Sequence, residues 1–149
     1  MNKELNIQTQ LKVRFSECDS LQIVWHGNYL KYFEEGREDF ARRHHISYLD
    51  AKANGFATPI VKSSCEHKLP LKYGDEFMVE TTFVPTASAK IIYQYRIFKD
   101  SQLICTGETV QVFVDENGAL VWNNPSFFLD WKKKMGLIWW RTFTYMKIA

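Results

Sequence analysis

The first part of the chain shows two hydrophobic patterns, one typical of a strand and one typical of a helix. Between residues 7 and 17 apolar and polar residues alternate, which predicts a strand with one buried face. From Asn28, a predicted N-cap, to about His45 the apolar residues follow helical spacing. The residues expected on the apolar faces are Ile7, Thr9, Leu11, Val13 and Phe15 of the strand and Tyr29, Leu30, Phe33, Phe40 and Ala41 of the helix.

Gly36 lies near the middle of this predicted helix. A glycine at an internal helical position costs roughly 1 kcal/mol relative to alanine, because its backbone loses more conformational freedom. We therefore interpret Gly36 as a place where the helix crosses very close to a sheet. Simple tolerance of a poor helix former is the alternative.

The chain after residue 56 is rich in predicted strands, and a short helix at 48–54 precedes them. Turn-forming residues separate four runs of strand-forming residues. Because these strands follow one another without intervening helices, the order β-α-β-β-β-β favours an antiparallel α+β fold over an alternating α/β fold. The predicted strands span residues 56–68, 75–84, 90–99 and 103–114.

The chain beyond the fourth of these strands is expected to turn back and end in a helix. The turn at 116–118 can fold residues 120–121 back as a hairpin. Asn124 followed by Pro125 predicts an N-cap and the first residue of a helix that runs to about Met135. In the preceding strand, the residues expected to share one face are Ile104, Val110, Val112 and Val114.

One acid and one imidazole stand out in the loop between the first strand and the long helix. Asp19 lies among apolar residues, and His26 lies where the helix is expected to begin. The N-terminal end of a helix carries positive partial charge and free N–H groups, which could polarise a carbonyl that Asp19 attacks. This layout is typical of an acyl-transfer site. The alternative is a turn-forming Asp19 that hydrogen-bonds its own backbone.

Composition and charge restrict the classes of function. The chain has 149 residues, 46% of them hydrophobic, which fits a single domain over 1–149 with a sizeable core. Its formal net charge is +2, from 19 basic and 17 acidic side chains, a balance too even for a protein that binds nucleic acid. Because no apolar run is long enough for a signal peptide or a membrane span, no membrane association is expected.

The cysteines and the remaining histidines show no pattern of a metal site or a disulfide framework. Three cysteines without a CxxC motif indicate free thiols and a reducing, cytoplasmic location. Cys18 neighbours Asp19, but strand alternation would point it to the opposite face, so we do not expect a cysteine nucleophile. His67 and the pair at 44–45 lack partners at metal-ligand spacing and are expected at the surface or at a helix end.

The segment CDSLQIVWHGNYLKYFEEGR at 18–37 resembles the signature of the 4-hydroxybenzoyl-CoA thioesterase family of hotdog-fold proteins. In that family an Asp precedes the residue that begins the central helix by seven positions, as Asp19 precedes His26. The resemblance covers about residues 7–121 and implies a curved antiparallel sheet wrapped around one long central helix. Its further matches are Thr58-Pro59-Ile60-Val61, Leu69-Pro70, Tyr73-Gly74-Asp75, residues 88–96 and Gly107-Glu108-Thr109.

The resemblance implies hydrolysis of an acyl-CoA thioester to a carboxylic acid and free CoA, with water and no metal or cofactor. Asp19 would act as nucleophile or as general base. His26 would hydrogen-bond the thioester carbonyl or assist proton transfer, its alternative being a helix-start histidine packed on an aromatic ring. The backbone amides near His26 and Gly27 are candidates for an oxyanion hole. The expected substrate-binding residues are Gly27, Val24, Trp25, Thr58 and Lys90.

A second acid and several cations have weaker assignments. Glu34 and Arg37 match the family's Glu-x-x-Arg pair, which we interpret as structural, while Glu34 remains the alternative base because another hotdog branch uses a helix glutamate. The side chains that could meet the phosphates of a carrier, or simply face solvent, are Lys62, Lys90 and Arg96.

The chain also departs from the family pattern. Ser20-Leu21-Gln22 fills the loop after Asp19, and Ala87-Ser88-Ala89 replaces a basic triplet that meets the nucleotide of CoA. These departures keep two alternatives open, a non-catalytic acyl-thioester binding module and a thioesterase acting on acyl carrier protein. The resemblance also implies a homodimer or tetramer with each site at a subunit boundary. The aromatic tail at 125–149 has no counterpart, and a subunit contact or a membrane contact could explain it.

Overall fold

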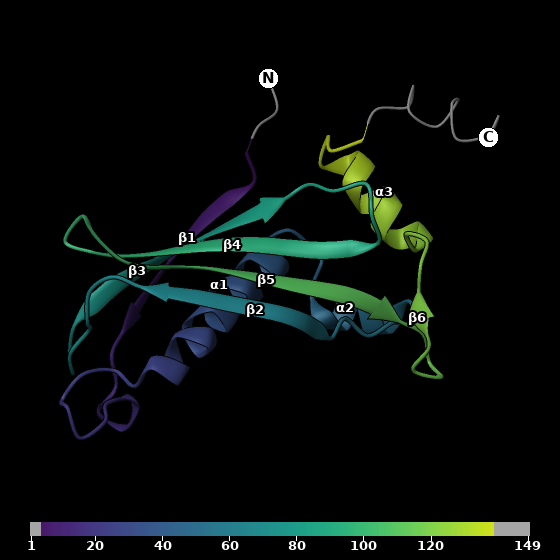
Figure 1. The fold of residues 1–149 in the computed structure, drawn as a ribbon. Helices are drawn as coiled ribbons and strands as arrows, with labels where there is room; N and C mark the ends of the chain where they lie inside the picture. The colour runs from purple at the N-terminus through teal and green to yellow at the C-terminus, as the bar shows by residue number, and fades with distance from the viewer. Residues whose placement is uncertain (1–3, 139–149) are drawn as a thin grey trace.

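The structure is a computed structural model, and it describes residues 4–138. A curved antiparallel sheet wraps around one long helix, which confirms the predicted α+β hotdog fold (Figure 1). The strands are β1 (Asn6–Lys12), β2 (Ile60–His67), β3 (Glu76–Val84), β4 (Lys90–Lys99), β5 (Gln102–Val114) and β6 (Leu120–Val121); the helices are α1 (Tyr29–Arg43), α2 (Tyr48–Ala53) and α3 (Ser126–Lys134); two 3₁₀ turns are η1 (Phe15–Glu17) and η2 (His26–Asn28).

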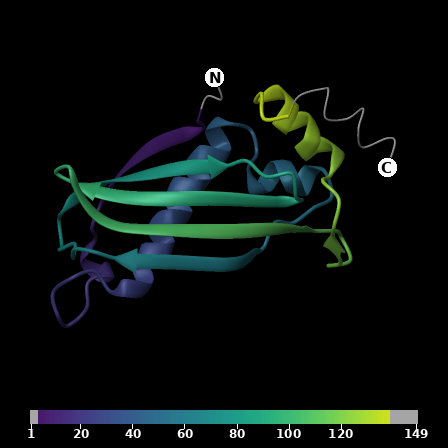
Figure 2. The same cartoon turned by 45° about the horizontal axis from the view of Figure 1, so that its top comes forward.

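The sheet has the strand order β1-β3-β4-β5-β2, and β6 pairs with the end of β5. All of these pairings are antiparallel. β1 and β2 are therefore the edges of the sheet, and Figure 2 shows β2 along one of them. The predicted strands differ most from the observed ones at the end of β1 and at the start of β2, where Pro59 has no N–H to donate to a ladder.

The inner face of α1 packs aromatic rings against the sheet. Phe33 stacks on Tyr95 of β4 with 4.5 Å between ring centroids, and Phe40 meets Tyr93 edge to face at 5.2 Å. Full burial of such a side chain stabilises a fold by about 1.5–3 kcal/mol. These contacts fix α1 across the middle of the sheet.

Two glycines allow this close contact, and the prediction for Gly36 is confirmed. A Cβ atom on Gly36 would lie 2.9 Å from Cγ1 of Val79 and even closer to Oγ1 of Thr81, both on β3. A Cβ atom on Gly107 of β5 would overlap the ring of Phe33. The helix and the sheet therefore meet with no room for a side chain at either position.

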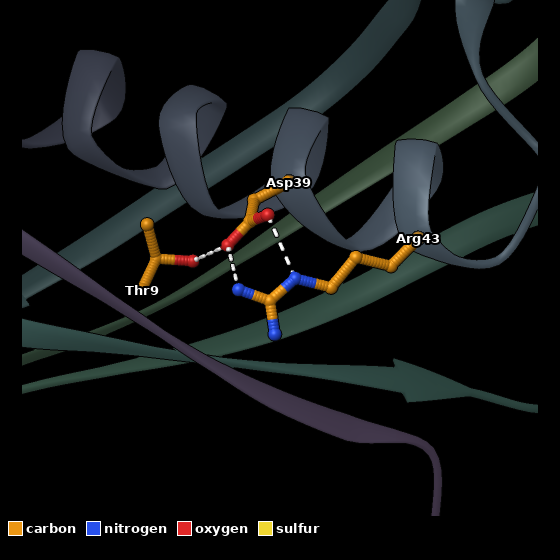
Figure 3. A network of polar contacts seen from close by, with 3 residues as sticks. All are labelled: Thr9, Asp39 and Arg43. Carbon is orange, nitrogen blue, oxygen red and sulfur yellow. Dashed lines mark hydrogen bonds and ion pairs between the residues drawn. The ribbon is translucent and has the colours of Figure 1, made fainter.

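Polar contacts tie the C-terminal half of α1 to the edge strand β1 (Figure 3). Asp39 accepts a hydrogen bond from the hydroxyl of Thr9 and forms a two-pronged ion pair with Arg43, at 2.9 and 3.0 Å. Thr9 belongs to the predicted inward face of β1, so its hydroxyl reaches the helix and not solvent. The helix is thus anchored at its far end from the Asp19 loop.

Two residues of the predicted apolar faces are exposed. Phe15 is 78% exposed, because β1 ends at Lys12 and Phe15 begins η1, where its ring meets Tyr73. Leu30 is 40% exposed, and Tyr32, which was not expected in the core, is buried instead. The buried face of α1 is therefore rotated slightly from the one that the sequence predicts.

The face of β5 is opposite to the predicted one. The register irregularity between Ile97 and Phe98 on β4 places one extra residue on β5, so Ile104 and its neighbour Cys105 are both buried. Beyond this bulge, buried and outward-facing residues alternate in the opposite phase to the predicted one. The buried residues of this part of β5 are Thr109, Gln111 and Phe113, while Val110, Val112 and Val114 are half-buried on the opposite face.

Neither predicted asparagine cap uses its side chain as a cap. Asn28 precedes α1, but its side-chain amide donates to the carbonyl of Glu17 at 2.8 Å. Pro125, not Asn124, is the N-cap of α3, and Asn124 instead accepts a hydrogen bond from the buried ammonium of Lys132 at 3.0 Å. That ammonium also donates to two carbonyls of the β3–β4 loop, and burial lowers the pKa of Lys132 to about 8.

The C-terminal segment is described only in part. α3 lies within the predicted helix from 124 to 135, and the aromatic residues from Trp139 onward lie outside the described residues. Within residues 4–138, no helix is long and apolar enough to cross a membrane.

We expect Gly36→Ala to lower the free energy of unfolding by about 1 kcal/mol, because crowding against β3 outweighs the better helix propensity of alanine. Thr81→Ala should partly restore stability in the double variant, since the buried Thr81 hydroxyl has no hydrogen-bond partner within the described chain. Chemical denaturation of both single variants and of the double variant measures this coupling. A Gly36→Ala protein as stable as wild type would contradict the close approach.

Candidate active site

The Asp19 loop is closed by its own backbone. The N–H of Asp19 donates to the carbonyl of Ile23 at 2.9 Å, and Gln22, with φ of 63°, donates back to the carbonyl of Asp19. One carboxylate oxygen of Asp19, Oδ1, accepts the N–H of Leu21 at 2.8 Å. Asp19 therefore forms the turn that we considered as an alternative, and this turn also fixes the direction of its carboxylate.

The environment of Asp19 is less enclosed than the sequence predicts. Asp19 is half-buried, and Val24 is buried in the core with its N–H bonded to the carbonyl of Leu71 at 2.8 Å. Leu21 and Trp25 are exposed, at 73% and 47%. The second carboxylate oxygen, Oδ2, has no hydrogen-bond partner among residues 4–138.

The start of the helix follows directly and leaves N–H groups free. Trp25 and Asn28 both hydrogen-bond the carbonyl of Glu17, which holds η2 against η1. Within the described chain, the backbone hydrogen bonds leave the N–H groups of His26 and Gly27 without an acceptor. These are the two amides expected to form an oxyanion hole.

Trp25 covers this turn and contacts the predicted catalytic histidine. Its ring lies so close to Gly27 that a Cβ atom there would overlap it, and its centroid is 5.2 Å from that of His26. His26 is exposed, and its ring packs beside the ring of Trp25, as our alternative interpretation expected. That contact also holds the imidazole near the free amides.

Asp19 and His26 line one shallow cavity of about 270 Å³. The loop and the start of α1 form one wall, and the chain leaving β2 forms the other. The lining residues are Asp19, Leu21, Ile23, Val24, His26 and Tyr29 on the first wall and His67, Lys68, Leu69 and Pro70 on the second.

His67 is the site residue that the sequence analysis missed. We expected it at the surface, and it is exposed, but its ring lies 4.8 Å from that of Tyr29 and 6.4 Å from that of His26, edge-on to each. Only the pairing of His67 with Cys105 across β2 and β5 brings it there. Strand alternation along β2 gives its face, but the register with β5 is not visible in the sequence.

Tyr29 forms the floor between the two imidazoles. It is 3% exposed, and burial raises the pKa of Tyr29 to about 12. Its hydroxyl is therefore neutral at physiological pH, and the charge in this cavity comes from the side chains at its rim. Within residues 4–138, no three His, Cys, Asp or Glu side chains converge as metal ligands do.

Two of the predicted substrate-binding residues lie elsewhere. Thr58 lines a separate cavity of about 320 Å³ beside α1, together with Glu34 and Arg37. Lys90 is exposed at the start of β4. It lies seven residues along that strand from Ile97, which pairs with Cys105, the β5 partner of His67. One copy of the chain does not bring Thr58 or Lys90 to Asp19.

Two further predictions concern charged residues on α1 and on the outer face of the sheet. No ion pair joins Glu34 and Arg37 in the described chain, and the hydroxyl of Tyr95 is hydrogen-bonded to Thr109 at 2.6 Å. Arg96 is paired with Glu80 at 2.6 Å on the outer face of the sheet.

Comparison with known proteins identifies the family of this chain. The family model of the thioesterase-like superfamily matches residues 13–132. YneP of Bacillus subtilis, described provisionally as an acyl-CoA thioesterase, is 28% identical over 123 residues, which are 82% of this chain and 89% of YneP.

Solved structures have the same fold. A protein from Aquifex aeolicus is 30% identical, with a TM-score of 0.77 over 84% of this chain and 98% of its own. The DHNA-CoA thioesterase from Staphylococcus aureus is 25% identical, with a TM-score of 0.79 over 88% of this chain and 89% of its own. Since the similar structures are named for several acyl groups, the comparison does not single out the 4-hydroxybenzoyl-CoA branch.

Proposed function

We infer that this chain, which belongs to the thioesterase-like superfamily, is an acyl-CoA thioesterase, and we propose that Asp19 is its catalytic acid. The observation that carries the proposal is the cavity that Asp19 shares with His26, at the turn where the N–H groups of His26 and Gly27 have no backbone acceptor within the described chain. The reaction consumes one water and one thioester and releases a carboxylic acid and free CoA. It uses no metal and no cofactor.

Asp19 is oriented for attack by its own turn. Because Oδ1 is held by the N–H of Leu21, Oδ2 is the oxygen presented to a substrate. It either attacks the thioester carbonyl, forming a mixed anhydride that water then hydrolyses, or takes a proton from the attacking water. In both routes negative charge develops on the carbonyl oxygen, where the N–H groups of His26 and Gly27 and the His26 side chain stabilise it.

Glu34 is less suited to this role. It lies on α1 in the second cavity with Thr58, apart from the amides at the start of the helix. We therefore propose an acid in the loop, the arrangement of the 4-hydroxybenzoyl-CoA branch, and leave the acyl group unassigned. We further propose a cytoplasmic location, supported by three cysteines that are all free thiols.

We also propose that two copies pair through β2. This edge strand has eight residues, of which only Cys65 is not exposed. It lies along one edge of the sheet (Figure 2), and its last residue, His67, lines the cavity that Asp19 lines. A long open edge otherwise invites uncontrolled pairing. Pairing of two β2 edges would place each cavity at a subunit boundary, where the Thr58 and Lys90 of a second copy could contribute.

Asp19→Asn is expected to lower turnover of acyl-CoA by at least about 100-fold, because an amide neither attacks a carbonyl nor accepts a proton from water. The asparagine oxygen can still accept the N–H of Leu21, so the loop should keep its shape. The measurement is release of free thiol from an acyl-CoA panel, with the exposed Asp100→Asn as matched control.

Equal rates for wild type and Asp19→Asn on every substrate would contradict the catalytic role of Asp19. Calorimetry then distinguishes the binding-module alternative, which requires tight acyl-CoA binding without product and an affinity that Asp19→Asn leaves unchanged. Presenting one acyl group on CoA and on acyl carrier protein identifies the preferred carrier.

His26→Ala is expected to lower kcat by about 10²-fold to 10³-fold with a smaller change in KM, because a donor to the oxyanion acts mainly in the transition state. Steady-state kinetics on the best acyl-CoA substrate separates the two constants. If kcat stayed normal while KM rose, His26 would position substrate and the backbone amides alone would stabilise the oxyanion.

A dimer or a larger even-numbered assembly is the expected state at micromolar concentration. Light scattering gives the mass, and hydrogen exchange reports on β2, whose outward N–H groups should be protected only if another strand covers them. A monomeric mass with rapid exchange at those amides would refute the proposed edge pairing.

A further inference from the structure

The catalytic cavity contains a second imidazole, on the wall facing Asp19. His67 is the last residue of β2 and shares the inner face of that strand with Cys65, since the two pair with Cys105 and Gly107 of β5. Asp19 and His26 come from the loop before α1, which supplies the other lining segment, and the His26 ring lies 6.4 Å from that of His67. A thioester bound between the walls would have its attacking group on one side and His67 on the other.

The ring of His67 is held in place but keeps one nitrogen free. Tyr29 meets it edge to face at 4.8 Å, and Nδ1 lies 3.9 Å from the sulfur of Cys65. Nε2 has no hydrogen-bond partner within residues 4–138. The ring is therefore oriented by its neighbours on β2 and α1, with a free nitrogen for a substrate.

A thioesterase has a second chemical task besides attack on the carbonyl. The carbon–sulfur bond must break, and the departing thiolate must gain a proton. Imidazole is the side chain best suited to hold and release a proton near neutral pH. We propose that His67 is the catalytic acid that protonates the leaving sulfur, an assignment that rests on the proposed function.

The proton balance closes over one turnover. The imidazolium of His67 gives its Nε2 proton to the sulfur as the carbon–sulfur bond breaks, and becomes neutral. The water that replaces the sulfur on the acyl carbon loses one proton, which Asp19 accepts and passes to solvent. His67 recovers a proton from solvent, so the net reaction is thioester plus water to carboxylic acid plus thiol.

The other groups at the cavity fit this task less well. Lys68 is ion-paired with Glu66 at 3.0 Å. Tyr29 is buried, and a hydroxyl whose pKa is raised to about 12 is a weak acid. His26 lies on the wall of the attacking acid, beside the amides that meet the carbonyl oxygen. His67 is therefore the group that protonates the leaving sulfur.

The test varies the leaving group while the acyl group stays constant. An acyl-CoA releases an alkanethiol, which needs a proton, whereas the matching phenyl thioester releases a much more acidic thiol, which does not. We expect His67→Gln to lower kcat/KM on acyl-CoA by about 10²-fold and to leave the phenyl thioester at the rate of the control. That control is His45→Gln, an exposed histidine outside the cavity.

Each outcome decides the proposal. Equal losses on both esters, or no loss on either, would overturn the role of His67, and His67→Asn with a thermal melt of each variant excludes misfolding as the cause of a loss. Asp19→Asn should lose activity on both esters, so a failure of the proposed role of Asp19 can be distinguished from a failure of the role of His67. Wild type without activity on either ester would overturn the proposed function, and this assignment with it.

Discussion

The close packing of α1 on the sheet is the constraint on which the rest of the structure depends. Gly36 and Gly107 remove the side chains that would separate the two layers, and the rings of Phe33 and Tyr95 then stack face to face. Protein interiors do not tolerate gaps or overlaps of this size, so the position of the helix along its axis is fixed. The start of α1, which carries the free N–H groups, is fixed with it.

The loop that holds Asp19 depends on that anchor and adds its own. The hydrogen bond from Val24 to Leu71 ties it to the body, the bond from Trp25 to Glu17 closes its base, and the turn at Asp19 closes its tip. An acid that must meet a carbonyl at a set distance gains from such preorganisation, because little ordering remains at the moment of reaction. Exposure of Leu21 at the tip leaves the cavity open to substrate.

The elements and the Asp19 loop could be predicted from the sequence, but contacts between strands could not. The hydrophobic period located α1, and β4 has the predicted limits, because each pattern depends on neighbouring residues alone. The prediction for the buried face of β5 was wrong because a bulge near Ile104 shifts the alternation of buried and outward residues. His67 was missed because its position depends on the pairing of β2 with β5, where it lies opposite Cys105. Both facts belong to pairs of strands that are distant in sequence.

The two walls of the cavity differ in how they are held, and this difference links chemistry to assembly. Asp19 and His26 are carried by a loop anchored in the core, whereas His67 is carried by β2, which among the described strands hydrogen-bonds only β5. An edge strand with one partner opens more readily than a strand with two. A strand that paired with the outer edge of β2 would therefore also restrain His67, so that the proposed subunit pairing and the geometry of the second wall would depend on the same hydrogen bonds.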